Sequence, residues 1–457
     1  MQTNIAERYS SDPKVQAAEN ILRKCVHCGF CLATCPTYNI LGDELDSPRG
    51  RIYQIKQVLE GDAPTLEVRN HLDRCLTCRN CETTCPSGVE YGRLLDVGRH
   101  IVEEQTTRPW HEQWMRKLVK FVLPYPSRIG TLIRLGQFFR PVLPERLAAS
   151  VPPAQAVIPD QPAPLSKRAG RRTMLLLEGC VQPAMAPATN TAAIRVLERL
   201  GITLLDGNSV CCGAIHHHLN DTPEALNFVR RNIDLWWPLI EQGAEAIVIT
   251  ASGCGSMVKD YGELLADDVD YADKAARVSE LTADLSEVVA DVAYGIAANE
   301  VAGGLCQTLY GRDKIDTRHL QGLADSRRVA LEEKSAATVA RESQQESFNV
   351  AFHPPCSLQH GQKLAGKVEK LLGDLGLNLV RFDDSQECCG SAGTYSIFQP
   401  KLSNTLKAKK LSNIHKAAPS VIVSANIGCQ LHLQSASKVP VMHWIELLDA
   451  ALPVEMP

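Results

Sequence analysis

The chain has little of what carries a protein into or across a membrane. Its first twenty residues, MQTNIAERYSSDPKVQAAEN, contain no apolar core of the kind found in secretory signals. No apolar run reaches the ~18–20 residues of a spanning helix, and the best candidate, residues 288–305, is interrupted by Asp291, Asn299 and Glu300. We therefore expect a cytoplasmic chain with no signal peptide and no transmembrane helix, whose thiols stay reduced.

Strong charge and nucleotide-binding motifs are also absent. The net charge of −4 is small, and hydrophobic and charged contents of 44% and 22% are those of an ordinary globular protein. The sequence shows no nucleic-acid motif, and no G-x-G-x-x-G follows a predicted strand. We expect no nucleic-acid partner and no flavin or nicotinamide on this chain. At 457 residues, it has room for about three domains.

Cysteine, by contrast, is abundant, with 17 residues. Residues 25–36 read CVHCGFCLATCP and residues 75–86 read CLTCRNCETTCP, an offset of 50 at every cysteine. Both runs follow the pattern C-x2-C-x2-C-x3-C-P of bacterial-type [4Fe–4S] proteins. The repeated spacing predicts two such clusters.

In two-cluster ferredoxins the fourth cysteine of a run ligates the other cluster. We therefore assign one cluster to Cys25, Cys28, Cys31 and Cys85, and the other to Cys75, Cys78, Cys81 and Cys35. Zinc is a weaker interpretation, because structural zinc sites use paired cysteines and leave the third cysteine of a run without a role. Disulfides need an oxidising compartment.

The segment around the two runs favours helices. Ser47 can cap a helix that starts at Pro48, apolar residues then recur at helical spacing, and Gly61 ends the pattern. Residues 91–104 show a similar periodicity. We predict an N-terminal α-helical two-cluster ferredoxin domain over residues 1–105.

Residues 106–172 are predicted to connect this domain to the rest. Pro124 and Pro126 divide residues 110–146 into two short amphipathic helices, and prolines between 152 and 164 mark an exposed linker. The first part carries several aromatic residues and seven basic residues, Arg116, Lys117, Lys120, Arg128, Arg134, Arg140 and Arg146. Such helices either lie in the headgroup region of a membrane, near a quinone, or pack on another part of the protein.

The remainder of the chain contains a second internal repeat. The sequence CCG occurs at 211–213 and at 388–390, and further cysteines align with offsets of 175 to 177. Short apolar runs alternate with helical patterns at 189–201 and 367–376, which predicts parallel sheets with the cysteines at the strand ends. We predict a multidomain α+β protein with two repeated α/β cysteine-rich (CCG) domains, at 173–294 and 347–457, separated by a polar insert at 295–346 with at least partial helix.

These motifs together resemble the iron–sulfur subunit of glycolate oxidase (glycolate dehydrogenase). The resemblance rests on CVHCGFC, PRGRI, CCGSAGTY and ANIGCQ, and it runs through essentially the whole chain. It implies an electron-transfer subunit that works with flavin-containing (FAD) partner subunits and passes electrons toward a quinone, at the cytoplasmic face of the inner membrane. The equivalent subunit for lactate or glycerol 3-phosphate is the nearest alternative.

The CCG repeats are also similar to those of heterodisulfide reductase subunits, whose pattern ends in C-x-x-C. Here Met257 and His432 stand where the second cysteine of that pair belongs. Two interpretations stay open, a further cluster in each repeat or redox-active thiols without metal. The candidate residues are Cys180, Cys211, Cys212 and Cys254 in the first repeat, and Cys356, Cys388, Cys389 and Cys429 in the second.

Histidines near these cysteines, His216, His217, His218, His353 and His360, are candidates for metal ligation or proton transfer. The missing C-x-x-C argues against a heterodisulfide-reductase-like thiol-disulfide enzyme. The two cluster motifs argue against a scaffold without redox function. We therefore expect no substrate oxidation by this chain alone and no catalytic residue on it.

Overall fold

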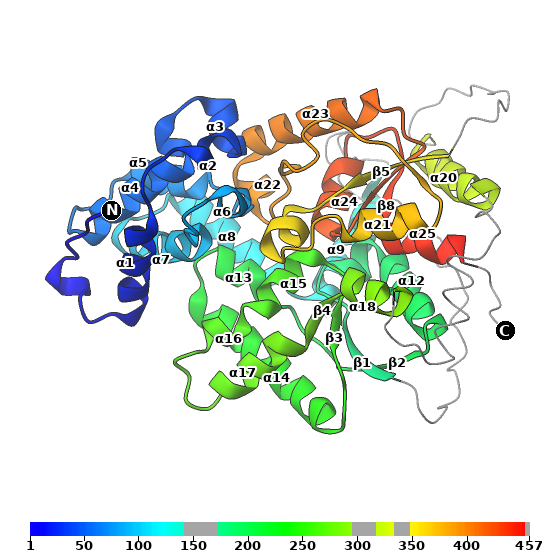
Figure 1. Ribbon diagram of the computed structural model, residues 1–457, viewed down its shortest axis with the longest axis horizontal. Helices are drawn as coiled ribbons and strands as arrows, with labels where there is room; N and C mark the ends of the chain where they lie inside the picture. Colours follow the sequence, from blue (N-terminus) through cyan, green and yellow to red (C-terminus); the bar gives the residue numbers. More distant parts are fainter. Residues whose placement is uncertain (141–171, 295–316, 333–347, 453–457) are drawn as a thin grey trace.

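The computed structural model of the chain (Figure 1) describes residues 1–140, 172–294, 317–332 and 348–452. The predicted proline-rich linker and much of the predicted polar insert lie outside these residues. Within the described part, no helix is both long enough and apolar enough to cross a membrane.

Residues 1–105 form a bundle of short helices, as the sequence predicts. Ser47 Oγ accepts a hydrogen bond from the Gly50 amide and caps α4, whose first residue is Pro48. Asp12 caps α1 in the same way, again before a proline. The helices are α1 (Pro13–Lys24), α2 (Phe30–Ala33), α3 (Pro36–Leu41), α4 (Pro48–Leu59), α5 (Leu66–Asp73), α6 (Asn80–Thr84) and α7 (Tyr91–Gln105).

The core of this bundle is formed mainly by α1, α4 and α7. Leu22, Ile55, Leu59, Leu94 and Leu95 are fully buried and belong to one apolar cluster. The cysteine-bearing loops and the short helices α2 and α6 lie around this core. It therefore holds the two cysteine runs in a fixed relation.

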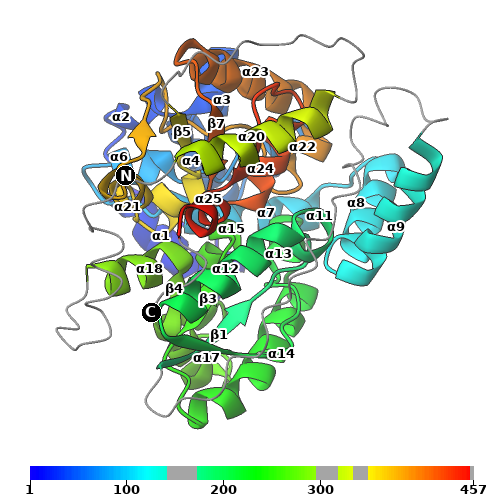
Figure 2. The same cartoon turned by 90° about the vertical axis from the view of Figure 1, so that its right-hand side faces the viewer.

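Two further helices follow, α8 (Trp110–Val122) and α9 (Pro126–Phe139), and they confirm the predicted break at Pro124 and Pro126. Figure 2 shows them together at one side of the molecule. The N-terminal end of α8 is anchored by Arg108, which pairs with Asp73 at 2.7 Å. Near its other end, Lys120 pairs with Asp221 of the first CCG domain at 2.6 Å.

The first CCG domain is built on a parallel sheet of order β2-β1-β3-β4. Its strands are β1 (Arg172–Leu177), β2 (Ile202–Leu205), β3 (Ile247–Ile249) and β4 (Thr282–Asp284). Its helices are α11 (Gln182–Met185), α12 (Pro187–Arg199), α13 (Ala214–His218), α14 (Thr222–Glu241), α15 (Ser252–Lys259), α16 (Tyr261–Leu264), α17 (Ala272–Leu281) and α18 (Leu285–Ala293).

The second CCG domain repeats this plan with a parallel sheet of order β6-β5-β7-β8. Its strands are β5 (Asn349–His353), β6 (Asn378–Leu379), β7 (Val421–Ser424) and β8 (Val441–His443). Its helices are α21 (Lys367–Asp374), α22 (Tyr395–Phe398), α23 (Pro400–Lys416), α24 (Ile427–Gln434) and α25 (Trp444–Ala451), and a π-helical turn covers Ser357–Gly361. The repeat seen in the sequence is thus a repeat of the fold.

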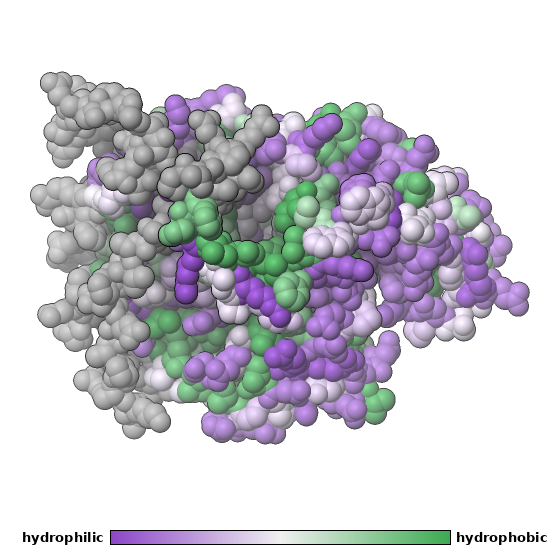
Figure 3. Space-filling view, turned by 180° about the vertical axis from the view of Figure 1, so that it is seen from behind, coloured by the Kyte–Doolittle hydropathy of each residue, from purple (hydrophilic) through white to green (hydrophobic). Residues whose placement is uncertain are grey.

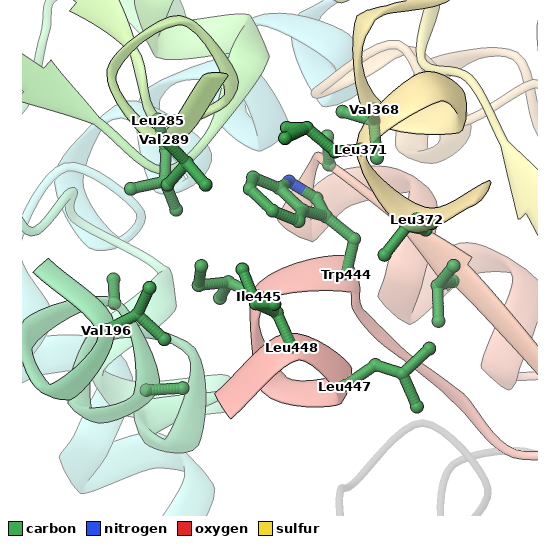
Figure 4. Close-up of a cluster of buried hydrophobic side chains, with 14 of the residues drawn as sticks. Val196, Leu285, Val289, Val368, Leu371, Leu372, Trp444, Ile445, Leu447 and Leu448 are labelled. Carbon is green, nitrogen blue, oxygen red and sulfur yellow. The ribbon is translucent and has the colours of Figure 1, made fainter. Parts of the chain in front are cut away.

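The two CCG domains share one hydrophobic core. Helix α12 of the first packs on α25 of the second, and α18 of the first packs on α21 of the second. Since α12 corresponds to α21 and α18 to α25, the domains are related by an approximate two-fold axis. Figure 4 shows Trp444 at the centre of this interface, with Val196, Leu285 and Val289 on one side and Val368, Leu371 and Leu372 on the other.

Helix α20 (Thr317–Glu332), within the predicted insert, also packs on α25. Its Leu320 and Ala324 are fully buried in the shared core, and Arg327 pairs with Glu446. The described part of the insert is therefore helical, and it contributes to the cores of the CCG domains.

The N-terminal bundle contacts both CCG domains (Figure 1). Arg79 pairs with Asp260 of the first at 2.9 Å, and Arg93 pairs with Glu263. Toward the second, Tyr395 Oη donates to the Arg74 carbonyl at 3.1 Å. The three parts therefore meet at one place.

Candidate functional site

The first cysteine group, quartet A, consists of Cys25, Cys28, Cys31 and Cys85. All four line one small cavity. Cys25 follows α1 directly and Cys85 follows α6, so the group joins the first run to the end of the second. Burial, together with the neighbouring thiols Cys25 and Cys85, raises the pKa of the Cys31 thiol to about 11.

The second group, quartet B, consists of Cys35, Cys75, Cys78 and Cys81, which line a separate cavity. Burial raises the pKa values of the Cys78 and Cys81 thiols well above their usual range, and both thiols count Cys35 and Cys75 among their electrostatic neighbours. The structure thus brings Cys35 toward the second run and Cys85 toward the first. This arrangement supports the crossed assignment, which stays a prediction about ligands.

The two cysteine loops have the same unusual backbone. His27 and Gly29 in the first loop, and Thr77 and Arg79 in the second, have φ values of 55°, 85°, 52° and 57°. Three of these four residues are not glycine, and the left-handed region is unfavourable for them. The Thr77 amide points at Cys75 Sγ at 3.4 Å, and hydrogen bonds of this kind tune iron–sulfur groups.

Two buried arginines lie next to quartet B, and neither is part of a cysteine motif. Arg51 is 1% exposed, bonds the His71 carbonyl at 2.7 Å, and has Cys75 and Cys35 as electrostatic neighbours. Arg99 donates to the carbonyl of Cys75 at 2.8 Å. Sequence analysis did not single out either residue, because a helical arginine gives no signal of its burial.

The first CCG domain gathers quartet C, which consists of Cys180, Cys211, Cys212 and Cys254. Cys180 follows β1, the Cys211–Cys212 pair follows β2, and Cys254 lies in α15 after β3. The thiol of Cys211 bonds those of Cys180 and Cys212, and Cys212 also bonds Cys254. Its hydrogen bond with Cys180 raises the pKa of Cys211 well above the usual range.

The second CCG domain gathers quartet D, which consists of Cys356, Cys388, Cys389 and Cys429. The Cys356 and Cys388 sulfurs are 3.9 Å apart. Cys389 bonds both Cys388 and Cys429. His353, the last residue of β5, lies beside Cys389 and Cys429.

A cavity of about 1570 Å³ connects these groups. Its wall includes cysteines of quartets B, C and D, namely Cys75, Cys78, Cys180, Cys211, Cys212, Cys254, Cys356, Cys388 and Cys429. Cys78 is an electrostatic neighbour of Cys356 and of Cys388. Quartet B therefore lies close to quartet D.

The remaining candidate histidines mainly connect parts of the structure. His216 lies 3.2 Å from Asp221, and His217 lies 3.4 Å from Asp96 of α7. His360 bonds Thr83 at 2.9 Å across the boundary with the N-terminal bundle. His217 and His218 also line the large cavity. Among the described residues, His353 is the histidine that forms a group with two cysteine thiols whose ligand atoms all lie within 4.8 Å of one another.

Comparison with protein families matches both parts of this architecture. A model described as a 4Fe-4S dicluster domain matches residues 21–89. A model described as a cysteine-rich domain matches residues 174–259 and 350–434. These matches lie inside the predicted ranges 1–105, 173–294 and 347–457, whose boundaries stay predictions.

Similar proteins were found along the whole length. The glycolate oxidase iron-sulfur subunit of Escherichia coli (strain K12) is 47% identical over 456 residues, which covers 100% of both chains. The probable glycolate oxidase iron-sulfur subunit of Bacillus subtilis (strain 168) is 28% identical and covers 95% of both chains. Lactate utilization protein A of Bacillus pumilus (strain SAFR-032) is 21% identical over 59% of this chain and 96% of its own.

Proposed function

The chain belongs to the family of glycolate oxidase iron–sulfur subunits, and from this premise we propose that it relays electrons within a glycolate dehydrogenase complex. Flavin-containing partner subunits oxidise glycolate to glyoxylate, and this chain accepts the electrons and passes them toward a quinone. The observation that carries the proposal is the placement of the cysteines. Quartets A and B lie in the helical bundle, and quartet B shares a cavity with the cysteines of both CCG domains.

The chemistry of quartets A and B suits two [4Fe–4S] clusters. The cysteines of quartet A line one cavity and those of quartet B another, with Cys81 lining both, and the Thr77 amide of the second loop points at Cys75 Sγ. Bound there, such clusters exchange one electron at a time and can divide the two-electron output of a reduced flavin. Arg51 and Arg99 place positive charge near quartet B, which offsets the negative charge of a thiolate-bound site.

Quartet D is the proposed next position after quartet B, because Cys78 is an electrostatic neighbour of Cys356. The low exposure of Cys388, Cys389 and Cys429, at 4%, 1% and 4%, fits a site shielded from water.

We further propose that α8 and α9 lie on the membrane surface that contains the quinone. They face the viewer in Figure 3, where an apolar band crosses the middle of the molecule. The exposed apolar side chains of the two helices are Trp110, Trp114, Met115, Leu118, Phe121, Leu132, Leu135, Phe138 and Phe139. Such a surface is costly in water and favourable at a lipid interface.

The contribution of charge to this surface differs from the sequence expectation. Arg116 pairs with Glu112 at 3.0 Å and Lys120 with Asp221, so both have partners inside the protein. Lys117 and Arg134 are the exposed basic residues of the described part of these helices. Apolar insertion is therefore the main contribution, with a smaller one from charge.

Purification of the complex followed by a donor screen tests the proposed function. The tagged chain is isolated with its partners, and dye reduction is measured with glycolate, lactate and glycerol 3-phosphate. We expect glycolate to have the highest kcat/KM, and the chain alone to reduce no dye with any donor. A preference for lactate would instead favour the function suggested by the name of the more distant Bacillus protein. Turnover by the isolated chain would contradict a relay.

A further inference from the structure

The second CCG domain has a fully buried histidine beside two cysteines of quartet D. His353 ends β5 and is 0% exposed. One ring nitrogen of His353 and the sulfurs of Cys389 and Cys429 all lie within 4.8 Å of one another. His353 ends β5, Cys389 lies in the loop after β6 and Cys429 lies in α24 after β7, so the fold itself brings them together.

Within the described part of the chain, neither ring nitrogen of His353 has a hydrogen-bond partner. This is unusual for a fully buried polar side chain, since nearly all such groups are paired in folded proteins. Other buried histidines of this structure do have partners. His443, also 0% exposed, accepts from the Ile445 amide and contacts the Thr250 carbonyl at 3.0 Å. The free nitrogens of His353 therefore need a separate explanation.

The equivalent position in the first CCG domain is Leu177. Strand register shows the equivalence, because Leu177 pairs with Ile249 as His353 pairs with Ser424. Leu177 is also buried. The two domains thus offer the same four cysteines, but only the second offers a nitrogen ligand at this position.

We propose that His353, Cys389 and Cys429 bind a thiophilic metal, iron or zinc, through one imidazole nitrogen and two thiolates. Neutral imidazole and thiolate are the usual ligands of both metals. In a tetrahedral site the ligand atoms lie about 3.3–3.8 Å apart. Small rotations of the three side chains would therefore bring the nitrogen and the two sulfurs to the distances that a bound ion requires. The inference builds on the proposed redox role of quartet D, but the site does not require electron transfer.

The surroundings of the three residues fit such a site. Cys388 bonds Cys389 and lies 3.9 Å from Cys356, so a further thiolate is at hand to complete the coordination. Asn426 Nδ2 donates to Cys429 Sγ at 3.7 Å and orients that sulfur. Ser424 Oγ donates to the His353 carbonyl at 3.0 Å and holds the end of β5.

The competing explanation is a histidine that only fills the core, and the variant His353→Leu separates the two. Leucine is the residue that the first domain has at this position. If His353 only fills space, the exchange removes two unpaired buried nitrogens and keeps or raises the thermal midpoint, with metal content unchanged. If it is a ligand, the full-length protein loses one metal equivalent or its nitrogen signal, and its thermal midpoint falls.

The experiment uses the full chain, purified anaerobically, with iron and zinc measured per chain. For iron, protein labelled with [15N]histidine should show a strong nitrogen coupling in electron–nuclear double resonance. For zinc, the zinc absorption edge should show one nitrogen shell at about 2.0 Å beside sulfur. Absence of both signals in the folded wild-type protein would overturn the proposal.

Two variants complete the test. His353→Cys replaces the imidazole with a thiolate, so it should keep the metal and lose the nitrogen signal. This variant therefore gives a result even if the leucine variant fails to fold. His360→Gln is the matched control, because His360 also lies near Cys356 but bonds Thr83, and it should change neither metal nor signal. Iron at quartets A and B, about eight atoms, should be unchanged throughout, which separates a failure of this proposal from a failure of the relay.

Discussion

At the scale of single residues, the cysteine loops are held in a conformation that most side chains avoid. His27, Thr77 and Arg79 have positive φ values without being glycine, at a cost on the order of 1 kcal/mol each. Such backbone is found where function needs it. Here it directs the Thr77 amide at Cys75 Sγ, and the matching conformation of the first loop indicates the same arrangement there.

The crossed assignment predicts that the fourth cysteine of each run ligates the cluster of the other run, whereas position in the sequence alone would assign it to its own run. Replacement of Cys35 by serine should damage the cluster held mainly by Cys75, Cys78 and Cys81, and Cys85→Ser should damage the one held by the first run. The reason is that Cys35 lines the cavity of quartet B and Cys85 that of quartet A. Electron paramagnetic resonance of each dithionite-reduced variant, with iron content per chain, measures which cluster is lost.

Ser87→Ala is a suitable control, because Ser87 lies beside quartet A without offering a thiol. It should keep both cluster signals. If Cys35→Ser abolished the cluster of its own run and left the other intact, the crossed assignment would be wrong.

Residue spacing alone predicted quartets A and B, because cluster ligation requires a fixed sequence pattern. The same approach could not find Arg51, since a single arginine on a helix gives no indication that it is buried beside Cys35 and Cys75, which lie 16 and 24 positions away in the chain. It named His353 only as one of several histidines. The sequence could not show that His353 in particular lies beside two thiols. That arrangement depends on the pairing of β5 with β7, which is a property of the tertiary structure.

At the scale of elements, the N-terminal bundle depends on the close approach of α4 and α7. A Cβ added at Gly98 of α7 would lie 2.6 Å from Ile55 Cγ1, and Ile55 is fully buried in α4. Gly98→Ala should therefore destabilise the bundle by about 1–3 kcal/mol through overpacking. The measurement is the thermal unfolding midpoint of the full chain, together with iron retention during heating.

Gly130→Ala is the matched control, since Gly130 lies in α9 and a Cβ there would have no atom within 4 Å. Alanine at an open helical position should be neutral or slightly stabilising. Equal effects of the two variants would show that α4 and α7 are not packed as described.

Helices α8 and α9 show what sequence periodicity can and cannot predict. The two prolines correctly placed the break between the helices. The count of basic residues suggested an electrostatic surface, but Arg116 and Lys120 use their charge in ion pairs with acidic residues of the protein. Glu112 lies in α8 itself, one turn before Arg116, but Asp221 belongs to the first CCG domain, so the pattern of one segment could not reveal the pairing of Lys120.

The exposed aromatic residues of these helices should therefore control membrane binding. Trp114 and Phe138 are 66% and 77% exposed, and burial of two such side chains in lipid is worth about 2–4 kcal/mol. The double variant Trp114→Gln, Phe138→Gln should lower affinity for anionic vesicles at least about tenfold. Co-sedimentation with vesicles, and quinone reduction by the assembled complex, measure the effect.

Two comparisons make this test specific. Val269→Gln removes another exposed apolar residue, 99% exposed in the first CCG domain, and should leave vesicle affinity unchanged. Lys117→Gln with Arg134→Gln should weaken binding less than the aromatic exchange does, and mainly at low salt. Unchanged vesicle binding by the aromatic variant would contradict membrane binding and would indicate that this surface contacts a partner chain instead.

At the scale of the whole molecule, the two CCG domains act as one unit with an approximate two-fold axis. Each domain contributes to the core around Trp444 (Figure 4), and Arg199 of one pairs with Asp449 of the other at 3.1 Å. The internal repeat predicted two copies of one domain. The repeat could not predict how the two copies pair. In the sequence, the helices that meet at the interface, α12, α18, α21 and α25, have the same amphipathic pattern as any helix that packs on its own sheet.

This pairing has a direct consequence for the cysteines. Ser252 of α15 and Ser357 after β5 are hydrogen-bonded at 2.8 Å across the axis, close to quartets C and D. The N-terminal bundle then closes the space above both domains through Arg79 and Tyr395. The cavity of about 1570 Å³ is the result, and no single domain could form it.

The relay itself is tested most directly by freeze-quench electron paramagnetic resonance of the assembled complex mixed anaerobically with glycolate. If this chain relays electrons, signals of reduced, interacting clusters appear within the time of one turnover, and only when the flavin-containing partners are present. The isolated chain, given glycolate, should stay silent although dithionite reduces it. Glycolate oxidation that proceeds at full rate while these clusters remain oxidised, or reduction of the isolated chain by glycolate, would contradict the account.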